Sequence, residues 1–153
     1  MTAALLAAGA FVAMEAVSYA MHRWIMHGIG YAWHRSHHEA GRGRFEANDR
    51  FPLIFAALGV TMFAVGSGPW PPAWWLAVGV TAYGAVYLVV HEVVIHRRVP
   101  LRLPATRLTT WLTAAHRDHH CGGDEPYGML LPLVRRPRYP SSDNGVDVLD
   151  RSS

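Results

Sequence analysis

Ten histidines carry the chemistry that can be read from this sequence, because all ten fall into four short clusters. Two clusters have the spacing His-x4-His and two have the spacing His-x2-His-His, and the order pair-then-triplet occurs twice along the chain. Imidazole is a common neutral ligand for iron, copper and zinc. The pattern therefore predicts a site for more than one metal ion, built from His22, His27, His34, His37, His38, His91, His96, His116, His119 and His120.

The two spacings make different demands on a helix. Residues i, i+3 and i+4 share one face of an α-helix, so each triplet can present neighbouring imidazoles to one ion or to two adjacent ions. Residues i and i+5 lie about 140° apart on a regular α-helix. Each His-x4-His pair therefore either serves two separate ions or lies on a locally widened helix, since a π-turn aligns i with i+5. The segment HEVVIH is also one residue too long for the zinc-protease pattern HExxH.

The number of histidines indicates which metal is bound. Ten imidazole nitrogens shared by two ions give five for each ion, which is close to octahedral with one position left for a small molecule. Zinc usually binds four ligands, so two zinc ions would leave histidines unused. We therefore expect two iron ions and a reaction that uses O2.

Three apolar segments must position these clusters. Thr2–Met21 has about the length that crosses a bilayer and contains a single charge, Glu15. Phe51–Gly66 and Ala73–Val90 follow, separated by the proline-rich stretch Ser67–Pro72, which ends one helix and allows another to start. The last two segments are therefore expected to form a helical hairpin with a tight, uncharged turn.

The placement of arginine predicts the orientation in the membrane. The chain has no lysine, and no arginine lies in residues 1–21 or 51–90, so the positive charge lies in the two histidine-bearing regions. By the positive-inside rule both regions face the cytoplasm. We expect an all-α integral membrane protein with three or four transmembrane helices and a histidine-rich di-metal cap on the cytoplasmic side. Residues 1–139 form one membrane-embedded domain in this interpretation, and residues 140–153 are a polar, disordered tail.

Histidine ligands need partners on their second ring nitrogen, and several side chains near the clusters are candidates. Glu15 is the most specific of them, because a carboxylate within a membrane segment is costly and usually functional. It shares a helical face with Tyr19 and His22 at i, i+4 and i+7, so it is expected to support His22 or the metal site. The alternative is a carboxyl that snorkels or is protonated and has no role. The supporting residues predicted on these grounds are Glu15, Tyr19, Glu92 and Asp118, with Glu39, Asn48 and Asp49 as further neighbours.

Four stretches carry a resemblance to a known family: HRWIMHGIGYAWHRSHHE, FEANDRFPLIFAALG, TAYGAVYLVVHEVVIHRR and AHRDHH. Over roughly residues 10–132 the chain resembles the bacterial non-haem β-carotene hydroxylases of the fatty-acid hydroxylase superfamily. The resemblance implies a di-iron monooxygenase with O2 as co-substrate, in which all ten histidines are metal ligands. It also implies hydroxylation of carotenoid β-ionone rings at carbon 3, from β-carotene through β-cryptoxanthin to zeaxanthin, or of ketolated rings toward astaxanthin. A ferredoxin and its reductase would supply electrons, and the location would be the bacterial inner membrane.

Other classes of function fit the sequence less well. A carotenoid ketolase or a fatty-acid or sterol desaturase-hydroxylase would use the same di-iron oxidant, so only the family resemblance argues against them. A bis-histidine haem protein would place its histidines inside the membrane. A non-enzymatic membrane metal-binding protein or transporter would need polar residues along a path through the bilayer, where Glu15 is the only charge. The basic face is expected to contact anionic lipid, and no nucleic-acid partner is expected.

Overall fold

The computed structural model describes residues 1–39, 45–101, 103–122 and 125–132. Within these ranges the chain is helical and contains no strand, as expected for the all-α class. The predicted tail, residues 140–153, lies outside the described residues.

Three helical rods are long and apolar enough to cross a membrane, and they span Thr2–Ile29, Ala47–Gly66 and Pro72–Ile95. The first consists of α1 (Thr2–Ala20) and the π-helix η1 (Met21–Ile29), and the second of the 3-10 turn η2 (Ala47–Asp49) and α3 (Arg50–Gly66). The third consists of α4 (Pro72–Tyr87) and the π-helix η3 (Leu88–Ile95). The three predicted apolar segments are confirmed, and the first and third continue as helix into their histidine motifs.

The expected hairpin is formed by α3 and α4, which pack against each other. Pro72 stands in the first turn of α4, where its missing N–H costs no helical hydrogen bond. Helix α4 also packs against α1, so it is the central helix of the three. Gly79 allows this second contact, because a Cβ at that position would collide with the Ala7 carbonyl and lie 2.7 Å from the Ala10 Cβ.

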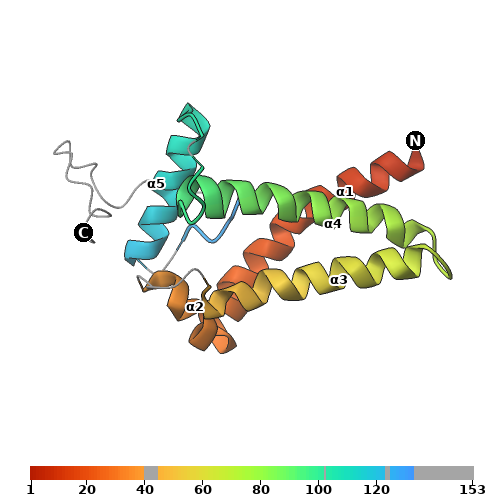
Figure 1. Cartoon of the computed structure of the whole chain (residues 1–153), viewed down its shortest axis with the longest axis horizontal. Coiled ribbons are helices and arrows are strands. Elements are labelled where there is room, and N and C mark those ends of the chain that lie inside the picture. Colours follow the sequence, from red (N-terminus) through yellow and green to blue (C-terminus); the bar gives the residue numbers. More distant parts are fainter. Residues whose placement is uncertain (40–44, 102, 123–124, 133–153) are drawn as a thin grey trace.

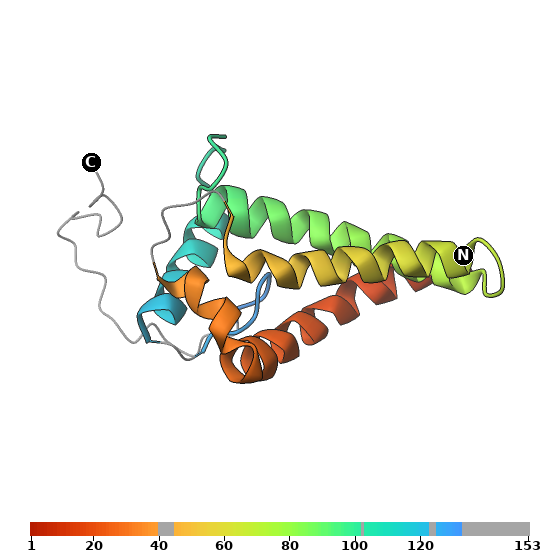
Figure 2. The same cartoon turned by 60° about the horizontal axis from the view of Figure 1, so that its bottom comes forward.

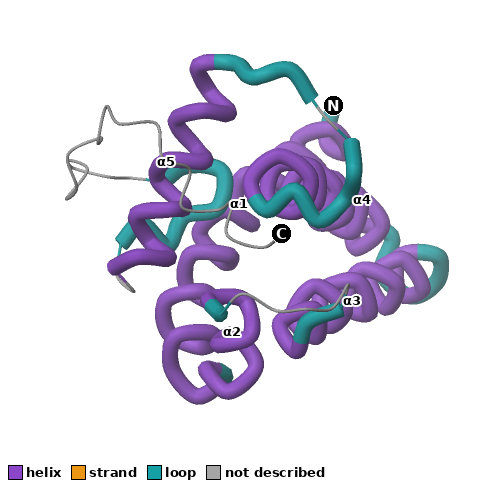
Figure 3. The backbone as a smooth tube through the Cα atoms, turned by 60° about the vertical axis from the view of Figure 1, so that its left-hand side comes forward, coloured by secondary structure: helices purple, strands orange, loops and turns teal. Residues whose placement is uncertain are grey.

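Two shorter helices complete the fold at one end of the bundle. Helix α2 (Tyr31–His38) follows η1, and α5 (Arg107–Gly122) follows η3. Both gather where η1 and η3 end, and α5 lies across the ends of the long helices (Figure 1). In the end-on view of Figure 3, α2 lies below α5 at the near end of the bundle. All four histidine clusters therefore meet at the same end of the bundle.

Candidate metal centre

Both His-x4-His pairs lie on π-helical segments, which resolves the alternatives that the sequence left open. The His96 N–H donates to the His91 carbonyl at 2.9 Å, five residues back, and Gly30 makes the same kind of bond to Ile25 at 2.7 Å. This wider winding brings i and i+5 onto one face. The ring centroids of His22 and His27 are 5.0 Å apart, and those of His91 and His96 are 4.5 Å apart. The widened helix is therefore the correct alternative for the local geometry.

Nine of the ten histidines assemble into two groups, and the ligand nitrogens of each group could hold one metal ion. We call the first group cluster A, and its five members have one ring nitrogen each within 4.8 Å of the others. Cluster B has four members that meet the same distance limit, and His91 borders it with its ring centroid 4.7 Å from that of His116. Cluster A is His22, His27, His34, His38 and His119, and cluster B is His37, His96, His116 and His120.

Each histidine triplet is divided between the two clusters. His34 and His38, one helical turn apart on α2, belong to cluster A, whereas His37 between them belongs to cluster B. On α5 the assignment is reversed, because His116 and the histidine one turn later belong to cluster B and His119 belongs to cluster A. Helices α2 and α5 thus each contribute histidines to both clusters, so both helices link the two clusters.

Several ring nitrogens within a cluster approach one another as ligands of a common ion do. Metal–imidazole bonds of about 2.0–2.1 Å at right angles place neighbouring nitrogens about 3 Å apart. The observed Nε2–Nε2 distances are 3.1 Å for His22–His34, 3.1 Å for His34–His38, 3.0 Å for His27–His119 and 2.8 Å for His96–His116.

The outer ring nitrogens show that some of these contacts are not hydrogen bonds. The Nδ1 of His22 is 2.9 Å from the Tyr127 carbonyl oxygen, and the Nδ1 of His34 is 2.8 Å from Oδ1 of Asn48. Both oxygens only accept, so each Nδ1 carries the proton and each Nε2 of the neutral ring presents a lone pair. Two lone pairs 3.1 Å apart repel each other, and a metal cation between them removes the conflict.

Unpartnered nitrogens point to the same conclusion in the second cluster. Within the described part of the chain, the Nε2 atoms of His37, His91 and His120 are buried and have no hydrogen-bond partner. Buried polar atoms almost always have a hydrogen-bond partner, so three such nitrogens at one place indicate a different kind of partner, such as a metal ion. The donor set therefore fits two metal ions that prefer imidazole.

Burial keeps these imidazoles neutral, which is the form that binds metals. It lowers the pKa of His34 to about 3, that of His38 to about 4 and that of His96 to about 2. The pKa of His116 is also well below its usual value because the ring is desolvated and surrounded by other histidines. At neutral pH these rings keep their lone pairs available.

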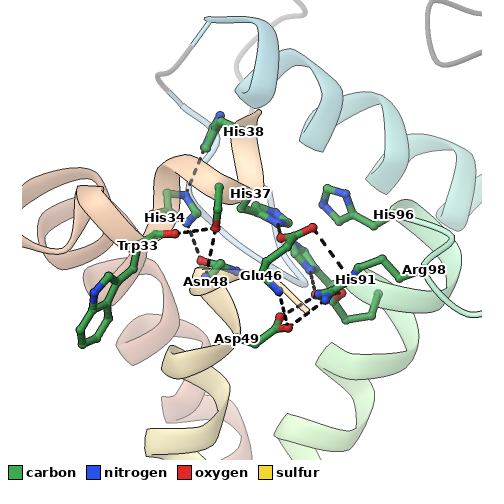
Figure 4. A network of polar contacts seen from close by, with 12 residues as sticks. Trp33, His34, His37, His38, Glu46, Asn48, Asp49, His91, His96 and Arg98 are labelled. Carbon is green, nitrogen blue, oxygen red and sulfur yellow. Dashed lines mark hydrogen bonds and ion pairs between the residues drawn. The ribbon is translucent and has the colours of Figure 1, made fainter. Parts of the chain in front are cut away.

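Carboxylates support the side of the site that contains cluster B. The Nδ1 of His37 is 3.3 Å from Oε2 of Glu46, and the Nδ1 of His91 is 2.7 Å from Oε1 of Glu92. Arg98 donates to Glu92 at 2.7 Å. It also donates to both oxygens of a third acid, Asp49, at 2.8 and 2.9 Å (Figure 4). Its hydrogen bonds to Asp49 and Glu92 raise the pKa of the Arg98 guanidinium, so the group carries its charge at all ordinary pH values.

The predicted supporting residues divide into those that reach a histidine and those that do not. Glu92 and the further neighbour Asn48 contact histidine rings directly. Glu15 and Tyr19 bind the segment after α5 instead of a ring. Among the described residues, Asp118 has no hydrogen bond or ion pair to a histidine. Asp49 binds Arg98, and Glu39 lies 3.6 Å from Arg35 on the same helix.

Sequence reasoning missed three residues at the site: Glu46, Arg98 and Tyr127. The hydrogen bond that Tyr127 accepts from His22 uses its backbone carbonyl, which leaves no signal in side-chain types. Glu46 and Arg98 are ordinary charged residues in loops, and only the fold brings them to the histidines. The sequence offers one hint of these residues, the position of Glu46 two residues before Asn48 in the stretch FEAND.

The comparisons with known proteins agree with this geometry. Residues 7–136 match the sequence profile of the fatty acid hydroxylase family. The match covers most of the chain and includes all ten histidines, so the chain belongs to the fatty acid hydroxylase family.

The relatives narrow the resemblance further. The chain is 42% identical over 122 residues to the β-carotene hydroxylase of Paracoccus sp. (strain PC1), covering 78% of this chain and 75% of the relative. It is 43% identical over 111 residues to the β-carotene hydroxylase of Pantoea ananas, covering 71% of this chain and 63% of the relative. A chloroplastic β-carotene 3-hydroxylase of Arabidopsis thaliana is 32% identical over 156 residues, covering 95% and 48% of the two chains. No solved structure matches the chain.

Proposed function

We propose that this chain is a di-iron, O2-dependent hydroxylase of carotenoid rings, acting at carbon 3 of the β-ionone ring. The observation that carries the proposal is the pair of histidine clusters, with opposed lone pairs in cluster A, in a chain similar to β-carotene hydroxylases. Its products from β-carotene would be β-cryptoxanthin and zeaxanthin, and ketolated rings would lead toward astaxanthin.

The residues have separate roles in this proposal. Cluster A would hold one iron ion, and cluster B together with His91 would hold the other. When bound, the two irons supply the activation of O2 for insertion of one oxygen atom into a ring C–H bond. Asn48, Glu92 and the Tyr127 carbonyl fix the ring orientation and tautomer of the histidines they touch.

The position of the clusters suits a substrate that is dissolved in the membrane. They lie at the end of three apolar rods, so a carotenoid in the bilayer can bring one ring to the metals while its polyene stays in lipid. The positive-inside rule favours a cytoplasmic location for this end in the bacterial inner membrane. Electrons would then come from a soluble ferredoxin and its reductase.

Expression in a bacterium that accumulates β-carotene tests the proposal. We expect β-cryptoxanthin and zeaxanthin to form, and the same conversion by the purified protein with iron, O2, ferredoxin and reductase. A His119→Ala variant expressed to the same level serves as the inactive control. Unchanged β-carotene under these conditions would overturn the assignment, and keto or desaturated products would assign the chain to a different reaction of the same oxidant.

A further inference from the structure

The segment after α5 returns along the first membrane rod. We call residues Glu125–Leu131 the strap, and in Figure 2 it is the blue segment that turns back beside α1. Its early residues contact η1 and the end of α1, and its later residues contact α1 further from the histidines. The strap therefore runs antiparallel to the rod, from the metal centre toward the middle of the membrane span.

Glu15 holds the deep end of the strap. Its Oε1 accepts from the backbone N–H groups of Met129 at 3.0 Å, Leu130 at 3.2 Å and Leu131 at 3.0 Å. Its Oε2 accepts from the hydroxyl of Tyr83 on α4 at 2.7 Å. Every group that faces this carboxyl in these contacts donates a hydrogen bond to it, which is the environment that suits a carboxylate.

These bonds explain why a charge can stand in an apolar helix. Glu15 lies within the apolar helix Thr2–Ile29, which is long enough to cross a membrane. The core of a bilayer offers no water to backbone polar groups. Non-helical backbone is tolerated at such depth only where its N–H and C=O groups are satisfied by protein. The carboxylate and the three N–H groups satisfy one another, so the acid and the strap depend on each other.

Gly128 allows the turn that brings three successive N–H groups to one carboxylate. A Cβ at this position would collide with the Leu131 carbonyl and would lie 3.2 Å from Oε1 of Glu15. No other amino acid leaves this space free. The deep end of the strap therefore has its own sequence requirement, independent of α1.

The other end of the strap is held at the same face of the first rod. Oε1 of Glu125 accepts from the Tyr19 hydroxyl at 2.6 Å and from the Arg23 guanidinium at 2.9 Å. Its Oε2 accepts from the N–H of Tyr127 at 3.0 Å. Together with Glu15, these residues explain the shared face that the i, i+4 spacing predicted: it is the surface on which the strap lies.

Tyr127 lies between the two anchors and covers cluster A. Its carbonyl faces the Nδ1 of His22, and its ring centroid is 5.5 Å from that of His22, 5.2 Å from that of His27 and 5.3 Å from that of His119. The residue is only 8% exposed. All three of these histidines belong to cluster A.

We propose that Glu15 is a positioning residue for cluster A, acting through the strap. By fixing the N–H groups of Met129, Leu130 and Leu131, it holds the Tyr127 carbonyl on His22 and the Tyr127 ring over the cluster. The iron identity of the bound metal rests on the proposed function, whereas the positioning role concerns any ion that cluster A binds.

The test uses Glu15→Gln in the full-length protein, with hydrogen exchange of the strap and metal content as readouts. The three strap N–H groups should exchange at least tenfold faster in the variant. Bound iron should fall from about two per chain to about one, with the Mössbauer signal of one iron lost. If the acid were only a costly membrane charge, the variant would keep both irons and melt at a higher temperature, which would overturn the proposal.

A second variant reaches the strap without changing the charge in the membrane. Gly128→Ala should also speed strap exchange and lower iron at cluster A, whereas Gly9→Ala on α1, where a Cβ meets nothing within 4 Å, should change neither. Retention of both irons in Gly128→Ala together with fast strap exchange would refute the link between strap and cluster. A wild-type protein that binds two irons but leaves carotenoids unchanged would refute the proposed function alone.

Discussion

Cluster A and cluster B share an arrangement of histidines but differ in what holds their rings. In cluster A the outer nitrogens of His22 and His34 face neutral oxygens, a backbone carbonyl and an amide. At cluster B the outer nitrogens of His37 and the bordering His91 face carboxylates, which Arg98 ties together. A carboxylate partner makes an imidazole more basic. We therefore expect the ion at cluster B to be held more tightly and to favour the more oxidised state.

The largest effect should come from His37 and His119. Each of them belongs to a different cluster from the other two histidines of its triplet. His119→Ala removes a histidine from cluster A, and His37→Ala removes one from cluster B. Under the proposed function each should lower carotenoid hydroxylation at least a hundredfold. Iron analysis of the purified variants should show less bound metal in both. Cys121→Ser, a change at an exposed thiol on the same helix as His119, is the matched control and should behave as wild type. Retained turnover in both histidine variants would rule out the two-cluster assignment.

A smaller effect should follow from exchanging the outer partners of the two clusters. Glu92→Gln gives His91 a neutral partner like those of cluster A, and should weaken iron binding at cluster B about 10- to 100-fold. Asn48→Asp gives His34 a charged partner like those of cluster B, and should strengthen iron binding at cluster A. Competition with a chelator, followed by the signal of each iron, measures both changes.

The comparison depends on these two variants changing iron affinity in opposite directions. If both substitutions weaken binding at their own cluster to the same degree, the charge of the partner is irrelevant and only its hydrogen bond matters. Glu46→Gln extends the test, because Glu46 faces His37 at 3.3 Å and is the longer of the two carboxylate contacts. Its effect at cluster B should be smaller than that of Glu92→Gln.

The smallest effect concerns acid. In the folded protein, protonation should reach cluster A before His96, whereas the loss of stability between pH 7 and pH 5 should come from both clusters. The folded-state pKa is about 3 for His34 and about 4 for His38, below the unfolded value of 6.5, so the unfolded chain binds more protons below that pH. Each such histidine costs the iron-free protein at most about 1.4 kcal/mol of unfolding free energy per pH unit below about 6. His96, with a pKa of about 2, stays neutral to lower pH. Melting temperatures of iron-free protein in detergent should fall between pH 7 and pH 5, and an unchanged melting temperature would contradict the burial of these rings.

Much of the fold could be predicted because the apolar segments and the histidine spacings obey simple geometric rules. The rods and the hairpin follow from length, apolarity and the prolines before Ala73. The spacing His-x4-His left two alternatives, and the hydrogen bond from His96 to His91 decides for the π-helix. The cytoplasmic orientation of the histidine clusters rests on the positive-inside rule and stays a prediction.

The division of the triplets could not be predicted, because it depends on how α2 and α5 meet. Helical spacing places His34, His37 and His38 on one face, but does not say which of them faces which partner. The role of Glu15 could be predicted only in part, for the same reason. Its depth in the membrane indicated a function, whereas its partners lie more than a hundred residues later at Met129–Leu131.

The contribution of α5 to both clusters has a consequence for how the protein is made. Because α5 follows the three rods in the sequence, a nascent chain that has inserted these rods still lacks His119 for cluster A and His116 and His120 for cluster B. Neither centre is complete until α5 has left the ribosome and docked. Under the proposed function, iron uptake would therefore be a late step in biosynthesis, and an interrupted chain would hold no complete centre for O2 activation.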